Sequence, residues 1–353
     1  MRIAIWGAGK MGQVHGNAYR KMGGDVEIGY VIERDREKAR AFAKGFNCTW
    51  IETIEELERG SVDAVDICLP THLHPDAVIK SLGTSDAVFC EKPLCLERET
   101  YERLKKAVGT GPGSVMIGQV LRFWNGYVKA KELLDKGAVG EPRMITCSRR
   151  QKMPAWSDGN WLIDSAKSGG LLMDLCIHDV DYVYWLLGRP KRVSCEIVKR
   201  ETVTLHGMVT LAYEGCCAAI TGSWGMPESF NGGELAAVLE IVGDQGMITY
   251  RGGDTLELIG EKGRETVRLG ARDGYEEELG YFVQCVRDRV TPARSDILSV
   301  EGTMEILWAA EQAWRTSRAV ELEGPGRSDG CSQESRRAAS DRMAAAERAA
   351  GSK

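Results

Sequence analysis

Near its start the chain reads Arg2-Ile3-Ala4-Ile5-Trp6-Gly7-Ala8-Gly9-Lys10-Met11-Gly12, an apolar run followed directly by a GxGxxG motif. The apolar run predicts a strand, and residues 11–22 predict a helix. Gly7 allows a tight turn, Gly9 lets the backbone approach a pyrophosphate, and Gly12 packs the helix against the strand. Because the amides and dipole at a helix N-terminus attract phosphate, the stretch predicts a dinucleotide-binding turn.

A carboxylate follows this motif at the expected distance. Glu33 lies 21 residues after Gly12, at the end of a second predicted strand over residues 26–32. A carboxylate there can accept hydrogen bonds from both ribose hydroxyls and repels a 2′-phosphate, which favours NAD over NADP. The neighbouring Arg34 leaves NADP open, because a guanidinium can accommodate a 2′-phosphate. The alternative is a plain glycine turn with Glu33 as a solvated charge.

Strands and helices alternate through the first 120 residues. After residue 32 the expected elements are a helix over 36–44, a short helix over 54–58 capped by Thr53, a strand over 62–69, a helix over 75–82, a strand over 87–90, a helix over 98–108 and a strand over 115–120. This alternation predicts a parallel sheet with right-handed crossovers.

The pattern changes after about residue 120, where strands follow one another without intervening helices. Helices are expected over 127–136, 171–187, 275–289 and 296–316, and strands over 143–149, 192–200, 208–213, 217–224, 236–242, 247–250 and 255–259. Successive strands predict a mostly antiparallel sheet. We therefore expect a dinucleotide-binding domain over 1–121 and a second domain over 122–324. Residues 325–353 are poor in large apolar side chains and predict a disordered or weakly helical tail.

Composition excludes several classes of protein. The 353 residues carry 46 basic and 51 acidic side chains and a net charge of -5, so no basic field attracts nucleic acid or an anionic membrane. No apolar run approaches the roughly 18–20 residues of a membrane span, and no secretory signal is visible. The 11 cysteines include no CxxC pair, which indicates reduced thiols and predicts a cytoplasmic protein.

Two motifs follow the later strands of the first domain. Pro70 and Thr71 come after the strand over 62–69, with His74 three residues on, at the sheet edge where ligands bind in open α/β folds. Thr71 and His74 either contact the cofactor or form a turn with a capping histidine. Glu91-Lys92-Pro93 comes after the next strand, where Lys92 can hold a substrate oxygen near the nicotinamide or extend into water.

A carboxylate and an imidazole lie on one predicted helix of the second domain. Asp174 and His178 are four residues apart and share a helix face. A carboxylate beside an imidazole raises its basicity and orients its tautomer, which suits proton exchange with an alcohol. The alternative is a satisfied polar pair. A metal site formed with Asp181 has no supporting Cys or His spacing, so we expect no metal.

Together these motifs resemble the Gfo/Idh/MocA oxidoreductases over residues 1 to about 322. The resemblance rests on four segments in order: Gly7 to Gly12 with His15, Glu91-Lys92-Pro93, Arg122-Phe123-Trp124, and Gly169-Gly170 leading to Asp174 and His178. It implies a Rossmann domain followed by an α+β domain on a large, mostly antiparallel open sheet. That sheet would form both a substrate wall and the contact of a homodimer or homotetramer.

The resemblance also implies the chemistry and the site residues. Lys92, Asp174 and His178 would form the catalytic set for hydride transfer between NAD(P) and a carbinol carbon of a sugar, sugar derivative or cyclitol. The expected cofactor contacts are Gly7, Gly9, Lys10, Met11, Gly12, Glu33, Arg34, Pro70, Thr71, His74, Glu91 and Lys92. The expected substrate contacts are Lys92, Arg122, Trp124, Asn125, Trp161, Asp174 and His178, with Trp156 as the alternative to Trp161. Thr71 stands where the family commonly has asparagine.

Two other functions remain open at this point. Some family members keep NAD bound and use transient oxidation to cleave a glycoside or to exchange hydride between two sugars. A non-catalytic dinucleotide-sensing regulator on the same scaffold is the third reading, against which the intact Lys92, Asp174 and His178 argue. Fold alone does not choose among these functions.

Overall fold

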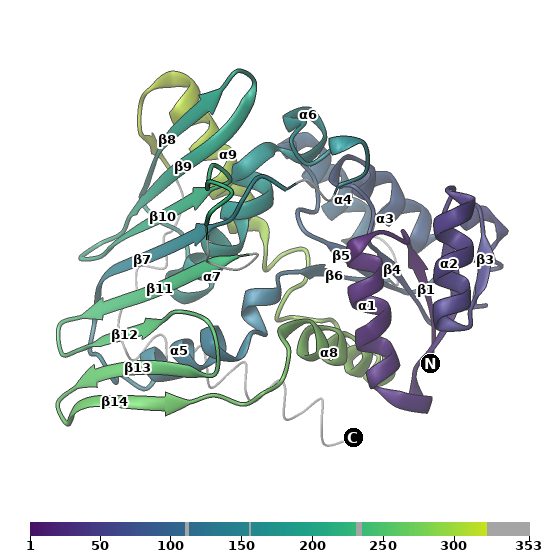
Figure 1. The fold of residues 1–353 in the computed structure, drawn as a ribbon, viewed down its shortest axis with the longest axis horizontal. Helices are drawn as coiled ribbons and strands as arrows, with labels where there is room; N and C mark the ends of the chain where they lie inside the picture. Colours follow the sequence, from purple (N-terminus) through teal and green to yellow (C-terminus); the bar gives the residue numbers. More distant parts are fainter. Residues whose placement is uncertain (110–112, 155–156, 231–234, 323–353) are drawn as a thin grey trace. The chain divides into compact units, whose positions relative to one another are not determined.

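The computed structural model describes residues 1–109, 113–154, 157–230 and 235–322 (Figure 1). The predicted tail over 325–353 and Trp156 lie outside these residues. The described residues divide into two compact units, the first formed by residues 1–120 and 273–300 and the second by residues 121–272 and 301–322.

The first unit is a six-stranded, wholly parallel sheet in the order β3-β2-β1-β4-β5-β6. Its strands are β1 Arg2–Trp6, β2 Glu27–Ile32, β3 Thr49–Ile51, β4 Ala64–Ile67, β5 Ala87–Glu91 and β6 Ser114–Gly118. Its helices are α1 Lys10–Lys21, α2 Arg36–Phe46, α3 His74–Leu82, α4 Arg98–Gly109 and α8 Gly274–Asp288. This order is that of a doubly wound dinucleotide-binding fold. The predicted parallel sheet is confirmed, and β3 is an addition to it.

Local sequence explains where the helices of the first unit begin and end. The Asp35 carboxylate accepts hydrogen bonds from the amides of residues 37 and 38 and so starts α2, which ends at Asn47 with a φ of 53°. Thr53 and Glu56 form a capping box around the single 3-10 turn Ile54–Glu56, as the predicted cap required. Strands β4 and β5 are buried at every position, and apart from Asp66 and Glu91 their residues are apolar.

Helix α8 belongs to the first unit, although its sequence position suggested the second domain. It packs beside α1, with an ion pair joining Lys21 to Glu276. The Phe282 ring meets Phe89 of β5 at 5.5 Å between centroids. The predicted second domain over 122–324 therefore differs from the second unit, which leaves out residues 273–300. The contacts that place these residues in the first unit join residues distant in sequence, so the sequence pattern does not show them.

The second unit is a nine-stranded sheet in the order β14-β13-β12-β11-β7-β10-β9-β8-β15, of which β7 to β14 are drawn from teal to green in Figure 1. Its strands are β7 Pro142–Arg150, β8 Arg192–Arg200, β9 Val203–Ala212, β10 Cys217–Ser223, β11 Ala236–Gly243, β12 Met247–Tyr250, β13 Thr255–Gly260, β14 Gly263–Arg268 and β15 Val320–Glu321. All the pairings are antiparallel except that of β7 with β10. The mostly antiparallel sheet is therefore confirmed, with β14 and β15 as additions.

One face of this sheet is covered by helices. The helices of the unit are α5 Asn125–Asp135, the short α6 Ser165–Ser168, α7 Ile177–Leu187 and α9 Glu301–Thr316. Of these, α5, α7 and α9 pack against the strands. Alternate residues of β9 show the two faces, since Val209 and Leu211 are buried while Met208 is 46% exposed.

The predicted helix over 171–187 consists of two parts. Leu172–Cys176 is a π-helical turn, and α7 begins directly after it. Among the described residues, none of the helices combines the length and the apolar character that crossing a bilayer requires.

Candidate active site

The glycine-rich turn of the first unit has the shape of a phosphate-binding loop. Gly7 adopts a φ of 111°, and a Cβ there would lie 2.7 Å from the carbonyl oxygen of Cys68. A Cβ on Gly12 would lie 2.0 Å from the Gly7 oxygen. A Cβ on Gly9, by contrast, meets nothing within 4 Å, so the backbone at Gly9 is open to a ligand. Helix α1 starts there without an acidic side chain in its first turn, which suits an anion.

Glu33 is held beside this turn by backbone hydrogen bonds. One carboxylate oxygen accepts from the amide of Ala8 and the other from the amide of Asp35, both at 3.0 Å. A carboxylate offers roughly four acceptor positions, so capacity remains for the hydroxyls of a ribose. Arg34 is exposed next to Glu33. The turn and Glu33 therefore fit an adenosine ribose and a pyrophosphate of NAD.

The segment after β4 buries both residues that the sequence singled out there. Thr71 is 3% exposed and His74 is 1% exposed. The two ring nitrogens of His74 lie 2.7 Å from the carbonyl oxygens of Leu69 and Pro93, and burial lowers the pKa of this imidazole in spite of these acceptors. His74 thus joins the turns that follow β4 and β5. This contact suits a residue that shapes the sheet edge.

Lys92 follows β5 at the carboxyl edge of the parallel sheet. The amide of Lys92 donates to the Glu91 carboxylate at 3.1 Å, and the Lys92–Pro93 peptide bond is cis. Strands β1, β4 and β5 are neighbours in this sheet, so the glycine turn after β1 and Lys92 after β5 share one edge. Ligands of open α/β sheets bind at this edge.

A buried ionic network lies behind Lys92. His15 of α1 is fully buried, with Nδ1 2.9 Å from Asp66 of β4 and Nε2 3.1 Å from Glu91. Burial would lower the pKa of His15, but the Asp66 carboxylate reverses this and holds that pKa well above its usual value. Burial would likewise raise the pKa of Glu91, yet His15 lowers it. An imidazolium donating from both nitrogens satisfies both carboxylates.

Sequence reasoning missed Asp66. In the sequence, His15 appears only as part of the family motif. An aspartate inside an otherwise apolar strand is a signal that could have revealed the network. The ligating atoms of His15, Asp66 and Cys68 also lie within 4.8 Å of one another, close enough to hold a metal ion. Burial and Asp66 raise the pKa of the Cys68 thiol, which disfavours the thiolate that a metal requires. Hydrogen bonds account for the cluster, because His15 Nδ1 lies 2.9 Å from Asp66 and 3.2 Å from the Cys68 sulfur.

The second unit carries the predicted acid–base pair at its π-helical turn. Gly169 and Gly170 both have positive φ angles, 75° and 67°, and lead the chain into this segment. Asp174 lies within the π-helical turn, and His178 is the second residue of α7. Both side chains are half-buried. π-helical turns are frequent at functional sites, and this one contains Asp174 and ends two residues before His178.

Arg122 has a partner within the second unit. Its guanidinium is 1% exposed and binds Asp181 of α7 through two hydrogen bonds of 2.8 and 2.7 Å. These bonds give the Arg122 side chain a structural role. The expected contact of Arg122 with substrate stays a prediction. Trp124 and Trp161 are half-buried. The Asn125 amide donates to the carbonyls of Gly270 and Arg272, so it holds the segment that follows β14.

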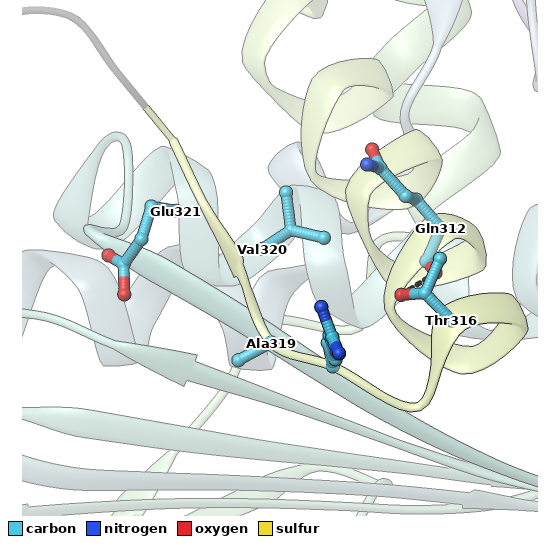
Figure 2. A pocket seen from close by; sticks show the side chains of 6 residues that line it. Gln312, Thr316, Ala319, Val320 and Glu321 are labelled. Atoms are coloured by element: carbon cyan, nitrogen blue, oxygen red, sulfur yellow. Dashed lines mark hydrogen bonds between the residues drawn. The ribbon is translucent and has the colours of Figure 1, made fainter.

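A separate open cavity of about 550 Å³ lies at the end of α9 (Figure 2). It is lined by Gln312, Thr316, Arg318, Ala319, Val320 and Glu321. None of the predicted site residues lines this cavity.

Comparisons with known proteins identify the two units. The model of an oxidoreductase family with an NAD-binding Rossmann fold matches residues 1–119, and the GFO/IDH/MocA C-terminal domain matches residues 127–249. A phosphate-binding turn on a doubly wound sheet, followed by this second domain, defines an NAD-binding oxidoreductase. The chain belongs to the Gfo/Idh/MocA family.

Named relatives support this membership. The chain is 27% identical over 345 residues to the myo-inositol 2-dehydrogenase of Thermotoga maritima, a match covering 92% of the chain and 99% of that enzyme. It is 31% identical over 189 residues to the inositol 2-dehydrogenase of Rhizobium meliloti, covering 53% of the chain and 55% of that enzyme.

Solved structures share the fold at lower identity. An oxidoreductase from Agrobacterium radiobacter in complex with NAD+, L-tartaric acid and magnesium has a TM-score of 0.81 at 18% identity, covering 91% of this chain and 98% of that one. Levoglucosan dehydrogenase in complex with NADH and levoglucosan has a TM-score of 0.82 at 18% identity, covering 92% and 100%. The solved structures confirm the predicted architecture, and the family match over residues 1–119 confirms the NAD-binding Rossmann domain.

Proposed function

We propose that the protein is an NAD-dependent dehydrogenase that oxidises a secondary hydroxyl of a cyclitol, sugar or sugar derivative, or reduces the matching ketone. The observation that carries this proposal is the sheet edge of the first unit, where Gly9 opens the backbone to a pyrophosphate and Lys92 follows β5. NAD, when bound, accepts or returns the hydride. The inositol dehydrogenases among the relatives support a cyclitol as the first substrate to test.

The proposed residue roles follow from the chemistry of each side chain. Lys92 holds the reacting oxygen through its ammonium, and Glu91 holds the backbone of Lys92 in place. His178 takes the proton of the hydroxyl during oxidation and returns it during reduction. Asp174 orients the imidazole of His178 and stabilises its protonated form. Half-buried Trp124 and Trp161 can offer aromatic faces to the C–H groups of a polyhydroxylated ring.

We also propose that the face of the second unit's sheet that none of the described helices covers joins copies of the chain into a homodimer or homotetramer. Met144, Val242, Met247 and Ile259 stand opposite one another on four adjacent strands of that face. Met144 is 43% exposed and Ile259 is 37% exposed in the single chain. An apolar row on an open sheet is the kind of surface that a second copy covers. We place the protein in the cytoplasm, since the described cysteines are free thiols.

The test is formation of NADH at 340 nm with NAD or NADP against a panel of cyclitols, aldoses, uronic acids and nucleotide sugars. Turnover with one class supports a freely exchanging dehydrogenase and identifies its substrate. Lys92→Ala should then abolish turnover while NADH affinity, measured by fluorescence titration, stays within a few-fold. No turnover across the panel, with NAD released on denaturation, would contradict free exchange and favour a retained-NAD enzyme. No turnover and no bound dinucleotide would place the dinucleotide-sensing regulator level with catalysis.

A further inference from the structure

Helix α7 is held by two buried arginine–aspartate pairs that flank His178. Asp179 accepts two hydrogen bonds of 2.9 Å from Arg149, and Asp181 accepts bonds of 2.8 and 2.7 Å from Arg122. These four side chains are between 0 and 4% exposed. Each pair is bidentate, so it fixes the direction of the aspartate as well as its distance.

The pairs lie on opposite sides of His178 around the helix axis. Successive residues of an α-helix are separated by about 100°, so Asp179 lies about 100° from His178 in one direction. Asp181, three residues on, lies about 60° from it in the other direction. A rotation of α7 that displaced His178 would therefore have to break at least one pair.

The partners of the two aspartates come from different parts of the second unit. Arg149 is on β7, which is central in the nine-stranded sheet, and it also donates to the hydroxyl of Tyr127 at 3.1 Å. Thr303 of α9 donates to Asp181 at 2.8 Å. Tyr182 of α7 donates through its hydroxyl to the carbonyl of Tyr127 at 2.8 Å. Helix α7 is thus tied to the sheet, to α9 and to α5.

The π-helical turn explains why such ties are needed. The wider turn over Leu172–Cys176 interrupts the α-helical ladder just before α7, so the preceding backbone does not impose the rotation of α7. Stability does not account for two ion pairs here, because buried ion pairs are often replaced by apolar residues without loss. The direction that the bidentate hydrogen bonds impose on α7 does account for the two pairs.

We propose that Arg149–Asp179 and Arg122–Asp181, with Thr303, are positioning residues that set the rotation of α7 and so aim the imidazole of His178. This inference rests on the proposed role of His178 as the proton acceptor. The positioning residues act through the helix and do not themselves touch the substrate.

A charge-neutral double variant tests the first pair. Arg149→Met with Asp179→Leu should leave the melting temperature within a few degrees and NADH affinity unchanged, while kcat falls roughly 10- to 100-fold, as expected for a misplaced catalytic group. The matched control is Lys131→Met with Asp135→Leu, which removes a 2.7 Å ion pair on α5 and should leave kcat within two-fold. Wild-type kcat in the double variant would overturn the proposal.

A milder series decides the matter if the double variant does not fold. Thr303→Val removes one hydrogen bond from Asp181 at nearly constant volume and should lower kcat a few-fold, whereas Thr303→Ser, which keeps the hydroxyl, should restore it. The ring resonances of His178 in NMR spectra, identified by their loss in His178→Asn, should shift in Thr303→Val and return in Thr303→Ser. Unmoved resonances would overturn the proposal. Full turnover by His178→Asn would instead refute the proposed function, and the resonances would still report on α7.

Discussion

Replacing His15 by leucine should destabilise the first unit strongly, because it strands two carboxylates in a dry interior. His15 is the shared partner of Asp66 and Glu91, at 2.9 and 3.1 Å, and is itself 0% exposed. Removing one partner of a buried ionic pair costs about 3–5 kcal/mol. For a unit of roughly 150 residues, each kcal/mol lowers the melting temperature by about 2–4 °C, so we expect a fall of about 6–20 °C.

The pH dependence gives the same prediction a sharper form. The pKa of His15 is raised above its usual value, so the folded unit holds a proton that the unfolded chain releases near pH 6.5. The stability that this proton contributes is complete below that pH and is lost as pH rises through the folded-state pKa. Within that interval the wild-type free energy of unfolding should fall by up to about 1.4 kcal/mol per pH unit. The leucine variant should lack this slope.

The assay is calorimetry of both proteins at pH 6.5, 7.5 and 8.5. His72→Leu is the matched control, because it removes an exposed histidine from the same unit and should leave the slope intact. Adding Asp66→Asn to His15→Leu should recover part of the loss by removing one stranded carboxylate. A loss below about 1 kcal/mol, or equal slopes in wild type and variant, would refute the buried imidazolium.

Three further changes test the turn, the cofactor preference and the second unit. Gly12→Ala should reduce NADH affinity roughly 100-fold in calorimetric titration, because its Cβ would lie 2.0 Å from the Gly7 oxygen, whereas Gly45→Ala, with open space around it, should leave affinity unchanged. Glu33→Ala should weaken NAD more than NADP, and an unchanged ratio of the two dissociation constants would show that Glu33 does not read the ribose. Asn125→Ala removes two hydrogen bonds to backbone carbonyls and should cost about 1–3 kcal/mol in urea denaturation. No change in the urea midpoint would show that these bonds add nothing.

Local features of the chain sufficed to predict the architecture of both units. Strands β4 and β5 are buried at every position and are apolar except at Asp66 and Glu91, so they can be recognised without knowledge of their neighbours. The glycine motif can be recognised locally, and Gly12 is required by a contact within the turn, although Gly7 is also required by the close approach of Cys68 after β4. Because Glu33 and Lys92 both follow strands at the carboxyl edge of the parallel sheet, the sequence also predicts that they lie at the same edge.

Contacts between residues far apart in sequence were beyond such reasoning. The sequence predicts α8 as a helix, but its membership of the first unit depends on Lys21 and Phe89, which lie more than 190 residues away along the chain. The π-helical turn at Asp174 has the same apolar pattern as an α-helix, so the sequence predicted a continuous element there. Periodicity reports which residues are buried and says little about the hydrogen bonds of the backbone.

The sequence by itself determined most of the strands and helices, the dinucleotide-binding turn and the family, because each is recognised from short stretches of neighbouring residues. Only the tertiary structure decided the partners of the buried charges. In the folded chain His15 lies between Asp66 and Glu91, and Arg122 pairs with Asp181 on α7. The physical reason is that a charge excluded from water must find its counterion wherever the fold brings one, at any distance along the chain.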